Sequence, residues 1–374
     1  MDSQHEYVHL WKLETLIKMS ATNGFLNDTN NTYGNTSGQY NDRAGLLSQV
    51  LQFEVTCFLA FGILVIILGI IGNTLSFIVI NRDYNKGSTF YFLQYLAVLD
   101  NLLLITMFLQ YSVLVGHHFE FMDQRYMAVR FCILTPLALS ARLPSAWLTV
   151  AVTIDRYIAV CRPLQAKEWC TIPRARKSII TILLLSIAIS LPRFFECIGY
   201  EYCFLQPECP TIQTVLLSDK HYQSIYHGTL FCFRAVIPLL ILVVLNCKLV
   251  RAVRERNRRR TGNNVRVGRQ SDNVTRVVII VITVFAICVF PSIFVRAIWL
   301  TREEWSPGMN AFYHYFNVLS GNLIIINSAV NFIIYDVASS VFRMQCRHLV
   351  CRKCDVDMNL IMATSTAETE LMNG

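Results

Sequence analysis

Seven long apolar runs constrain the fold of this chain more than any other feature of its sequence. They cover residues 54–80, 88–115, 129–160, 178–198, 222–250, 274–300 and 309–336. Runs of roughly 20 apolar residues are long enough, as helices, to cross a hydrocarbon core of about 30 Å. None shows the strict two-residue alternation of a barrel strand, and lipid offers no partner for open backbone groups. We therefore expect an all-α membrane protein, a bundle of seven transmembrane helices.

The composition supports a membrane protein and argues against two other classes. Of the 374 residues, 54% are hydrophobic and 16% are charged, which is more apolar than a soluble domain of this size. The net charge of +8 does not indicate a nucleic-acid partner, because Lys and Arg fall in short blocks beside the apolar runs. The runs hold no His cluster and no pairing of a nucleophile with a base, so we expect no enzymatic activity.

Basic residues and glycosylation sequons predict the same orientation in the membrane. Lys and Arg concentrate in the links 81–87, 161–177 and 248–276, which the positive-inside rule places in the cytoplasm. Three sequons, at Asn27, Asn30 and Asn35, precede the first run and are usable only outside the cell. We therefore expect a multi-pass protein of the plasma membrane with an extracellular, glycosylated N-terminal segment.

One carboxylate, that of Asp100, lies in the middle of the second run, where a polar group is costly and usually functional. Other runs place neutral polar residues at a similar depth: Asn73, Ser145, Asn327, Ser328 and Asn331. A carboxylate ringed by neutral oxygens suits a hard monovalent cation, so we expect Asp100 and the last four of these residues to hold an allosteric sodium ion. A protonated Asp100 within a hydrogen-bond network is the alternative. We expect no other cofactor.

Several short motifs occur in a fixed order, one set per apolar run. The tripeptide Asp155-Arg156-Tyr157 ends the third run where it meets the cytoplasm. The others are Gly72-Asn73, Leu96-Ala-Val-Leu-Asp100, Pro238, Phe285 with Cys288 and Pro291, and Asn331 with Tyr335. With this combination the chain resembles the rhodopsin-like (class A) family of G-protein-coupled receptors, over about residues 50–350.

Within that family, the chain looks most like the invertebrate FMRFamide-type neuropeptide receptors. This narrower likeness is carried by Pro136-Leu-Ala-Leu, Leu191-Pro-Arg-Phe-Phe-Glu196, Leu245-Asn246 and Asn327-Ser-Ala-Val-Asn331-Phe-Ile-Ile-Tyr335. Three positions depart from the family pattern: Phe332 replaces the usual proline, Val289 the usual tryptophan and Asn246 the usual tyrosine. The usual aromatic trigger and tyrosine relay are therefore not expected to work unchanged.

The resemblance implies a receptor for an extracellular neuropeptide that activates a heterotrimeric G protein. In the family, outward movement of the sixth helix releases an arginine of the third helix, here Arg156, from the neighbouring acid, here Asp155. The likeness gives roles in this activation to Asp155, Arg156, Tyr157, Asn331 and Tyr335. It also implies arrestin, receptor kinases and membrane lipids as further partners.

The resemblance also divides the chain and suggests its covalent modifications. The segments are a glycosylated extracellular segment (1–50), the seven-helix bundle (51–337), an amphipathic juxtamembrane helix (338–354) and a disordered cytoplasmic tail (355–374). In or beside the juxtamembrane helix, Cys346, Cys351 and Cys354 are candidates for palmitoylation, with free cytosolic thiols as the alternative. The family's disulfide implies a bond from Cys132 to the second outer loop. We expect Cys209 as its partner, with Cys203 as the second choice.

The outer half of the bundle carries the candidate ligand-binding residues. They are Arg142, Arg193, Glu196, Arg234, Arg296 and Tyr315. An unpaired guanidinium within a transmembrane run is expensive, so each arginine needs an acid from the protein or from the ligand. In the first case, Glu196 and backbone carbonyls neutralise the arginines. In the second, the ligand brings an acidic or carbonyl-rich group, and Glu196 remains available to a basic residue of the ligand.

Other ligands and other functions fit the sequence less well. Receptors for amines in this family carry an aspartate where this chain has Ala138, so an amine ligand is not expected. A receptor of the same fold for a small acidic molecule or a lipid is the alternative, which a graded response to peptide extract distinguishes. A transporter or channel is a remote alternative, because it would require inverted repeats or a path of charged residues along several helices. The sequence shows neither.

Overall fold

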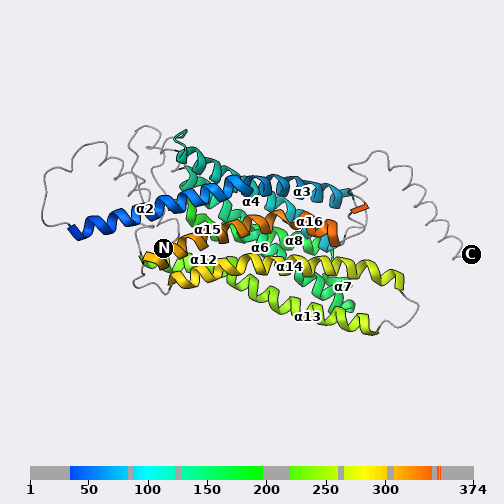
Figure 1. Cartoon of the computed structure of the whole chain (residues 1–374). Helices are drawn as coiled ribbons and strands as arrows, with labels where there is room; N and C mark the ends of the chain where they lie inside the picture. Colours follow the sequence, from blue (N-terminus) through cyan, green and yellow to red (C-terminus); the bar gives the residue numbers. More distant parts are fainter. Residues whose placement is uncertain are drawn as a thin grey trace, which may run out of the picture.

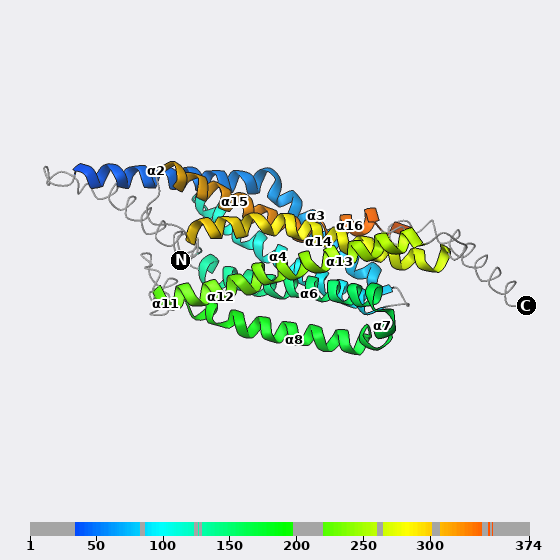
Figure 2. The same ribbon diagram turned by 90° about the horizontal axis from the view of Figure 1, so that it is seen from below.

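The structure is a computed structural model that describes residues 34–82, 87–122, 126, 129–196, 220–259, 265–300, 307–338, 343–344 and 346. Within these ranges all regular secondary structure is helical. The long helices lie side by side in one elongated bundle (Figures 1 and 2). The all-α prediction is therefore confirmed.

The first three passes are long helices, two of which contain a π-helical turn. The first pass consists of α2 (Gly34–Cys57), the π-helical η1 (Phe58–Gly62) and α3 (Ile63–Arg82). The second is α4 (Ser88–His118), and the third is the π-helical η2 (Arg130–Leu134) followed by α6 (Thr135–Cys161). Helix α2 begins well before the predicted run at residue 54, because an apolar run marks only the part of a helix that lipid surrounds.

The remaining four passes complete the bundle. The fourth is α8 (Ile172–Ser190) with the 3-10 turn η3 (Leu191–Phe195), and the sixth is α14 (Val265–Leu300). The fifth consists of five short and long pieces in succession: α11 (Lys220–Tyr222), η4 (Gln223–His227), α12 (Gly228–Phe231), η5 (Cys232–Val236) and α13 (Ile237–Arg259). The seventh consists of α15 (Pro307–Ala329) and α16 (Asn331–Ala338). Six helices among the described residues are long and apolar enough to cross a membrane, and the seventh pass is divided between its two helices.

Prolines explain where the fourth pass begins and ends. Thr171 is extended and Pro173 lies in the first turn of α8, which suits a residue that has no N–H to donate. At the outer end, Pro192 lies in the tight turn η3, so the α-helix stops at Ser190 instead of continuing to the predicted residue 198. A short helix that the sequence did not predict, α7 (Pro163–Trp169), begins at Pro163 for the same reason.

The seventh pass is nearly continuous, although Phe332 stands where the family usually has proline. Only Val330 separates α15 from α16, and its N–H donates to the carbonyl of Ile326 while its own carbonyl accepts from Ile334, both at 3.0 Å. Phe332 packs over Gly72 of α3, where an added Cβ would lie 2.7 Å from the Phe332 Cβ. The glycine therefore allows the first and seventh passes to approach closely, as small residues do in membrane bundles.

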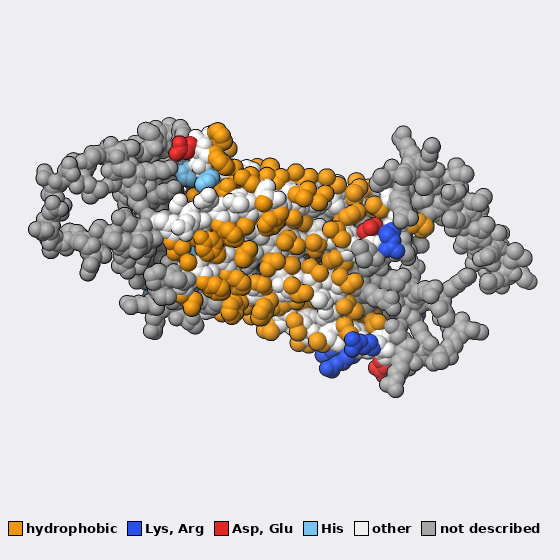
Figure 3. Space-filling view, in the orientation of Figure 1, with side chains coloured by type: hydrophobic (Ala, Val, Ile, Leu, Met, Phe, Trp, Pro, Cys, Tyr) orange, Lys and Arg blue, Asp and Glu red, His pale blue; other side chains and the backbone are white. Residues whose placement is uncertain are grey.

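The bundle exposes apolar side chains to lipid and buries polar ones. Leu64, Leu184 and Ile287 are 60, 62 and 63% exposed, whereas Asn73 and Asp100 inside the bundle are at most 1% exposed. Hydrophobic side chains cover the middle of the face in Figure 3, and the described charged side chains lie toward its two ends. The buried polar groups must therefore find their partners within the protein.

Candidate functional site

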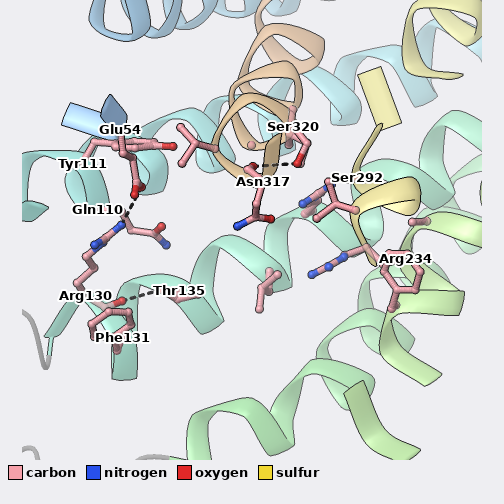
Figure 4. Close-up of a pocket in the computed structure, with 18 of the residues that line it drawn as sticks. Glu54, Gln110, Tyr111, Arg130, Phe131, Thr135, Arg234, Ser292, Asn317 and Ser320 are labelled. Carbon is pink, nitrogen blue, oxygen red and sulfur yellow. Dashed lines mark hydrogen bonds and ion pairs between the residues drawn. The ribbon is translucent and has the colours of Figure 1, made fainter. Parts of the chain in front are cut away.

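A cavity of about 240 Å³ lies at the end of the bundle that the predicted topology places outside the cell. Its lining residues come from α2, α4, η2, α6, η3, α12, η5, α14 and α15, so every pass contributes to the wall. Figure 4 shows the polar side chains that point into it. Pockets for whole drug-sized ligands measure roughly 300–1,000 Å³, so this cavity admits a few side chains of a ligand.

Three of the predicted ligand-binding arginines come together in this cavity. Arg142 of α6, Arg193 of η3 and Arg234 of η5 all line it. Arg142 forms no ion pair within the part of the chain that the structure describes, and the positive charge of Arg234 acts directly on it. The part of the cavity wall that Arg142 and Arg234 form is therefore strongly cationic, and it favours an acidic or carbonyl-rich group of a ligand.

Arg193 differs from the other two because it has an acid of its own. Its Nη1 lies 2.9 Å from Oε2 of Glu196, and both side chains are almost fully buried. The tight turn η3 brings these residues together, since they are three positions apart. The carboxylate also accepts a hydrogen bond from the Tyr222 hydroxyl at 3.1 Å, and His227 Nε2 lies 3.4 Å away. Glu196 thus neutralises Arg193, which is the first of the two cases that the sequence left open, and it is not available to a ligand while this cluster persists.

Of the remaining two predicted residues, one lies away from the cavity and the side chain of the other is not described. Tyr315 of α15 is absent from the lining residues, and its ring packs edge-on against Phe53 of α2 with centroids 5.1 Å apart. Arg296 belongs to α14, but its side chain lies outside the described part of the structure.

The cavity also contains a buried ion pair that sequence reasoning missed. Arg130 Nη2 of η2 lies 3.3 Å from Oε1 of Glu54 in α2, and Gln110 of α4 lies beside them (Figure 4). These charged residues stand at the beginning of the first and third apolar runs, where a charge is ordinarily expected to reach the lipid headgroups. The available signal was that both residues fall just inside the boundaries of their apolar runs.

Halfway along the bundle, Asp100 is the centre of a hydrogen-bond cluster. Its carboxylate accepts from the Ser145 hydroxyl at 3.0 Å and from Asn331 Nδ2 at 2.6 Å, and the Ser328 hydroxyl also bonds to it. Asn73 Nδ2 donates to the Ser328 carbonyl at 2.9 Å, while Asn73 Oδ1 is buried with no hydrogen-bond partner among the described residues. This set of oxygens, with one spare acceptor, fits a sodium ion.

The fifth residue of the predicted ion site, Asn327, lies half-buried on α15 next to Ser328. Its side chain is not part of the hydrogen bonds that surround Asp100 in the described residues. The cluster therefore rests on Asp100, Ser145, Ser328 and Asn331.

At the opposite end of the bundle, Asp155 joins the third pass to the second. Its carboxylate accepts from Ser88 Oγ at 2.5 Å and from Thr89 Oγ1, and it pairs with Arg156 Nη2 at 2.9 Å. Ser88 and Thr89 form the first turn of α4, so the positive end of that helix also stabilises the carboxylate. Arg156 is thereby held against its neighbour at this end of the bundle.

The linker between α7 and α8 adds a contact to the same place. The Cys170 thiol donates to the backbone carbonyl of Asp155 at 3.5 Å. Burial, followed by the negative charge of Asp155, raises the pKa of Cys170 to about 11. The thiol therefore stays protonated at neutral pH and keeps its hydrogen to donate. Of the other predicted activation residues, Tyr157 is half-buried, Asn331 belongs to the Asp100 cluster, and the Tyr335 side chain lies outside the described residues.

The structure describes only some of the residues that are predicted to carry covalent modifications. Cys132 is disulfide-bonded, and its predicted partner Cys209 lies outside the described residues. The Cys346 thiol is free and half-buried, and burial together with Asp336 raises its pKa. Asn35 belongs to α2, although its side chain is not described. Outside the described residues lie Asn27, Asn30, Cys351 and Cys354.

Known proteins similar to this chain are seven-helix receptors. Residues 72–335 match the family described as the 7 transmembrane receptor (rhodopsin family). The chain is 30% identical over 294 residues to an FMRFamide receptor of Drosophila melanogaster, a match that covers 74% of this chain and 50% of that receptor. The chain therefore spans about half the length of that relative.

The match to this chain covers a larger share of two further relatives. The FMRFamide peptide receptor frpr-18 of Caenorhabditis elegans is 28% identical over 306 residues, covering 76% of this chain and 67% of the relative. Neuromedin-U receptor 2 of Mus musculus is 28% identical over 296 residues, covering 78% and 74%. The predicted likeness to rhodopsin-like receptors, and to the FMRFamide receptors among them, is confirmed, and with it the seven-helix bundle. These relatives are receptors rather than enzymes.

Replacing Arg142 or Arg234 by alanine removes a guanidinium from the cationic end of the cavity. If the ligand brings an acid or carbonyl there, each change lowers its potency roughly 30- to 1000-fold, or about 2–4 kcal/mol. Arg142→Lys keeps the charge but loses the planar fork, so it should fail nearly as badly. Potency is compared at matched surface expression with Arg174→Ala, since Arg174 lies at the other end of the bundle, paired with Glu168 at 3.2 Å. Potencies within about threefold of wild type for these two and Arg296→Ala would show that the arginines are structural.

Proposed function

We propose that this chain, which belongs to the rhodopsin family of seven-transmembrane receptors, binds an extracellular neuropeptide at the plasma membrane and activates a heterotrimeric G protein inside. The names of the relatives support a peptide, because they describe receptors for FMRFamide and for neuromedin-U. The N-terminus then lies outside the cell, and the loops rich in Lys and Arg face the G protein.

The observation that carries the proposal is the position of two polar sites at the two ends of α6. Arg142 lines the outer cavity, and Arg156 belongs to the inner cluster around Asp155. The two arginines are 14 residues apart on one helix, or about 21 Å at 1.5 Å per residue. Between them, Ser145 ties the same helix to Asp100. A ligand that shifts α6 from outside therefore acts on the inner cluster through one continuous helix.

The sixth pass supplies the moving part of the proposed switch. Ser292 and Val295 of α14 line the cavity directly after Pro291, which removes one backbone hydrogen bond and provides a bend. Further in, Asn246 of α13 donates to Thr283 of α14 at 3.4 Å, a long and therefore weak hydrogen bond. A ligand that binds one arrangement of α14 better shifts the population toward it. Outward movement of α14 then opens a space for the G protein beside Arg156.

A second candidate function is a receptor of the same fold for a small acidic molecule or lipid. The observation that favours it is the cationic end of the cavity, where Arg142 and Arg234 both line the wall and the charge of Arg234 acts on Arg142. A calcium and cyclic-nucleotide screen of transfected cells against a neuropeptide library separates the two. A graded response to a peptide supports the first proposal, and a response to acidic metabolites or lipids alone supports the second.

Replacing Arg156 by alanine is expected to abolish G-protein activation while ligand binding survives, because Arg156 lies at the cytoplasmic end, far from the cavity. The measurement is nucleotide exchange on the G protein alongside ligand binding. Arg162→Ala is the matched control, since Arg162 is an exposed arginine of the same region whose side chain donates to Gln165 at 3.3 Å. Normal nucleotide exchange by the Arg156→Ala receptor would refute the proposed role.

Replacing Asp100 by asparagine is expected to remove any sensitivity of agonist binding to sodium. The carboxylate is the only formal charge in its cluster, and its oxygens are the strongest ligands that the site offers to a hard cation. Agonist affinity is compared in sodium chloride and in choline chloride at equal ionic strength. Glu168→Gln, an exposed cytoplasmic change of the same kind, should behave as wild type. Equal sodium dependence in Asp100→Asn and wild type would exclude an ion site at Asp100.

A further inference from the structure

The cavity presents a ligand with a single carboxylate. Among the described residues that line it, Glu54 is the one acid, and it stands against four arginines: Arg130, Arg142, Arg193 and Arg234. Glu196 is close by, but it lies behind Arg193, to which it is paired at 2.9 Å, and it is not a lining residue. A cationic group of a ligand that enters the cavity therefore has one formal negative charge to pair with.

Glu54 is bound by its arginine less tightly than Glu196 is. The Glu54–Arg130 contact is 3.3 Å long, whereas Arg193 lies 2.9 Å from Glu196, whose carboxylate also accepts from Tyr222. A charge-assisted hydrogen bond is usually shorter than 3 Å, so the Glu54–Arg130 contact is the weaker of the two. The Arg130 guanidinium also lies 5.5 Å from the centre of the Phe131 ring, a cation–π contact that does not depend on Glu54. Arg130 can therefore give up the carboxylate without losing every partner.

The two ends of the cavity differ in charge, because the carboxylate of Glu54 lies at one of them. Figure 4 shows Glu54 at one end with Gln110 and Arg130, and Arg234 at the other end with Ser292. At the Glu54 end, Gln110 Nε2 is buried with no hydrogen-bond partner among the described residues, so it has a hydrogen to offer to a ligand carbonyl. At the other end, Arg234 and Arg142 offer only positive charge and donors. A ligand that carries a basic group on one side and an acidic or carbonyl group on the other therefore fits with its basic group toward Glu54.

We infer that Glu54 is the subsite for a cationic group of the ligand, a guanidinium or an ammonium, which replaces Arg130 on the Glu54 carboxylate while the acidic or carbonyl-rich part of the ligand lies against Arg142 and Arg234. The inference rests on the proposed function, in which a peptide enters this cavity. It assigns to Glu54, on the first pass, the pairing with a basic ligand residue that sequence analysis had left open for Glu196.

When no ligand is bound, Arg130 occupies the position on Glu54 that we assign to the ligand's cation. Glu54 and Arg130 are only 6 and 7% exposed, and a buried carboxylate without a counter-ion is strongly unfavourable. Arg130 neutralises Glu54 while the cavity has no ligand, and a ligand guanidinium or ammonium takes over that neutralisation while Arg130 keeps its contact with the Phe131 ring. A neutral ligand of the same shape gains no such exchange, because it brings no positive charge to the Glu54 carboxylate. The pair therefore selects for charge at one position of the ligand.

The test compares two peptides that differ only in charge at that position. The probes are the amidated tetrapeptide Phe-Met-Arg-Phe-amide and its analogue with citrulline, a neutral isostere, in place of arginine. Their potencies and binding affinities are measured on full-length wild type, Glu54→Gln and the double variant Glu54→Gln/Arg130→Gln at matched surface expression. Wild type should prefer the arginine peptide by at least about tenfold, and both variants should bind the two peptides equally to within about threefold.

The double variant guards against misfolding, because it removes the unpaired Arg130 charge that Glu54→Gln alone leaves buried. The matched control is Glu168→Gln, which breaks an Arg–Glu pair of 3.2 Å at the cytoplasmic end and should keep the wild-type preference. A preference retained in both Glu54 variants, or absent from wild type, overturns the subsite and leaves the peptide-receptor proposal standing. A wild-type receptor that binds neither these probes nor any arginine-containing member of a neuropeptide library overturns both.

Discussion

Lipid cannot form hydrogen bonds with the helices that it surrounds, and this shortage of partners governs where polar groups occur in the bundle. Every buried polar side chain must be satisfied by another part of the protein, by an ion or by a ligand. Three clusters of described polar groups bear most on the proposed function: the outer cavity, the cluster around Asp100, and the cluster around Asp155 at the opposite end of the bundle. Hydrophobic packing fills the space between them.

These three places share the third pass. Helix α6 supplies Arg142 to the cavity, Ser145 to the Asp100 cluster, and Asp155 with Arg156 to the cytoplasmic end. A helix is stiff along its axis, so a change in one cluster biases the other two without a long chain of side-chain contacts. The second pass is joined to it twice, by Asp100 in the middle and by the first turn of α4 at the cytoplasmic end.

Much of this arrangement could be predicted from the sequence, because the length of an apolar run and the order of the motifs are local properties. The passes, the Asp100 cluster and the neighbouring pair Asp155–Arg156 belong to this part. Contacts between residues far apart in the chain could not be predicted. Glu54 and Arg130 are separated by 76 positions, and each alone looks like an ordinary charge at the end of a helix. The turn that pairs Arg193 with Glu196 depends on the local geometry after Pro192, and it removes from the cavity the acid that the sequence had left open to a ligand.

The central claim is that a peptide bound in the outer cavity moves the sixth pass away from the third at the cytoplasmic end. Its most direct test is the distance between spin labels at the cytoplasmic ends of α4 and α14, measured by pulsed electron resonance on the purified receptor in nanodiscs. The account predicts a longer distance when a saturating agonist peptide and G protein are present than in the free receptor. An unchanged distance distribution, with peptide binding confirmed in the same sample, would contradict it.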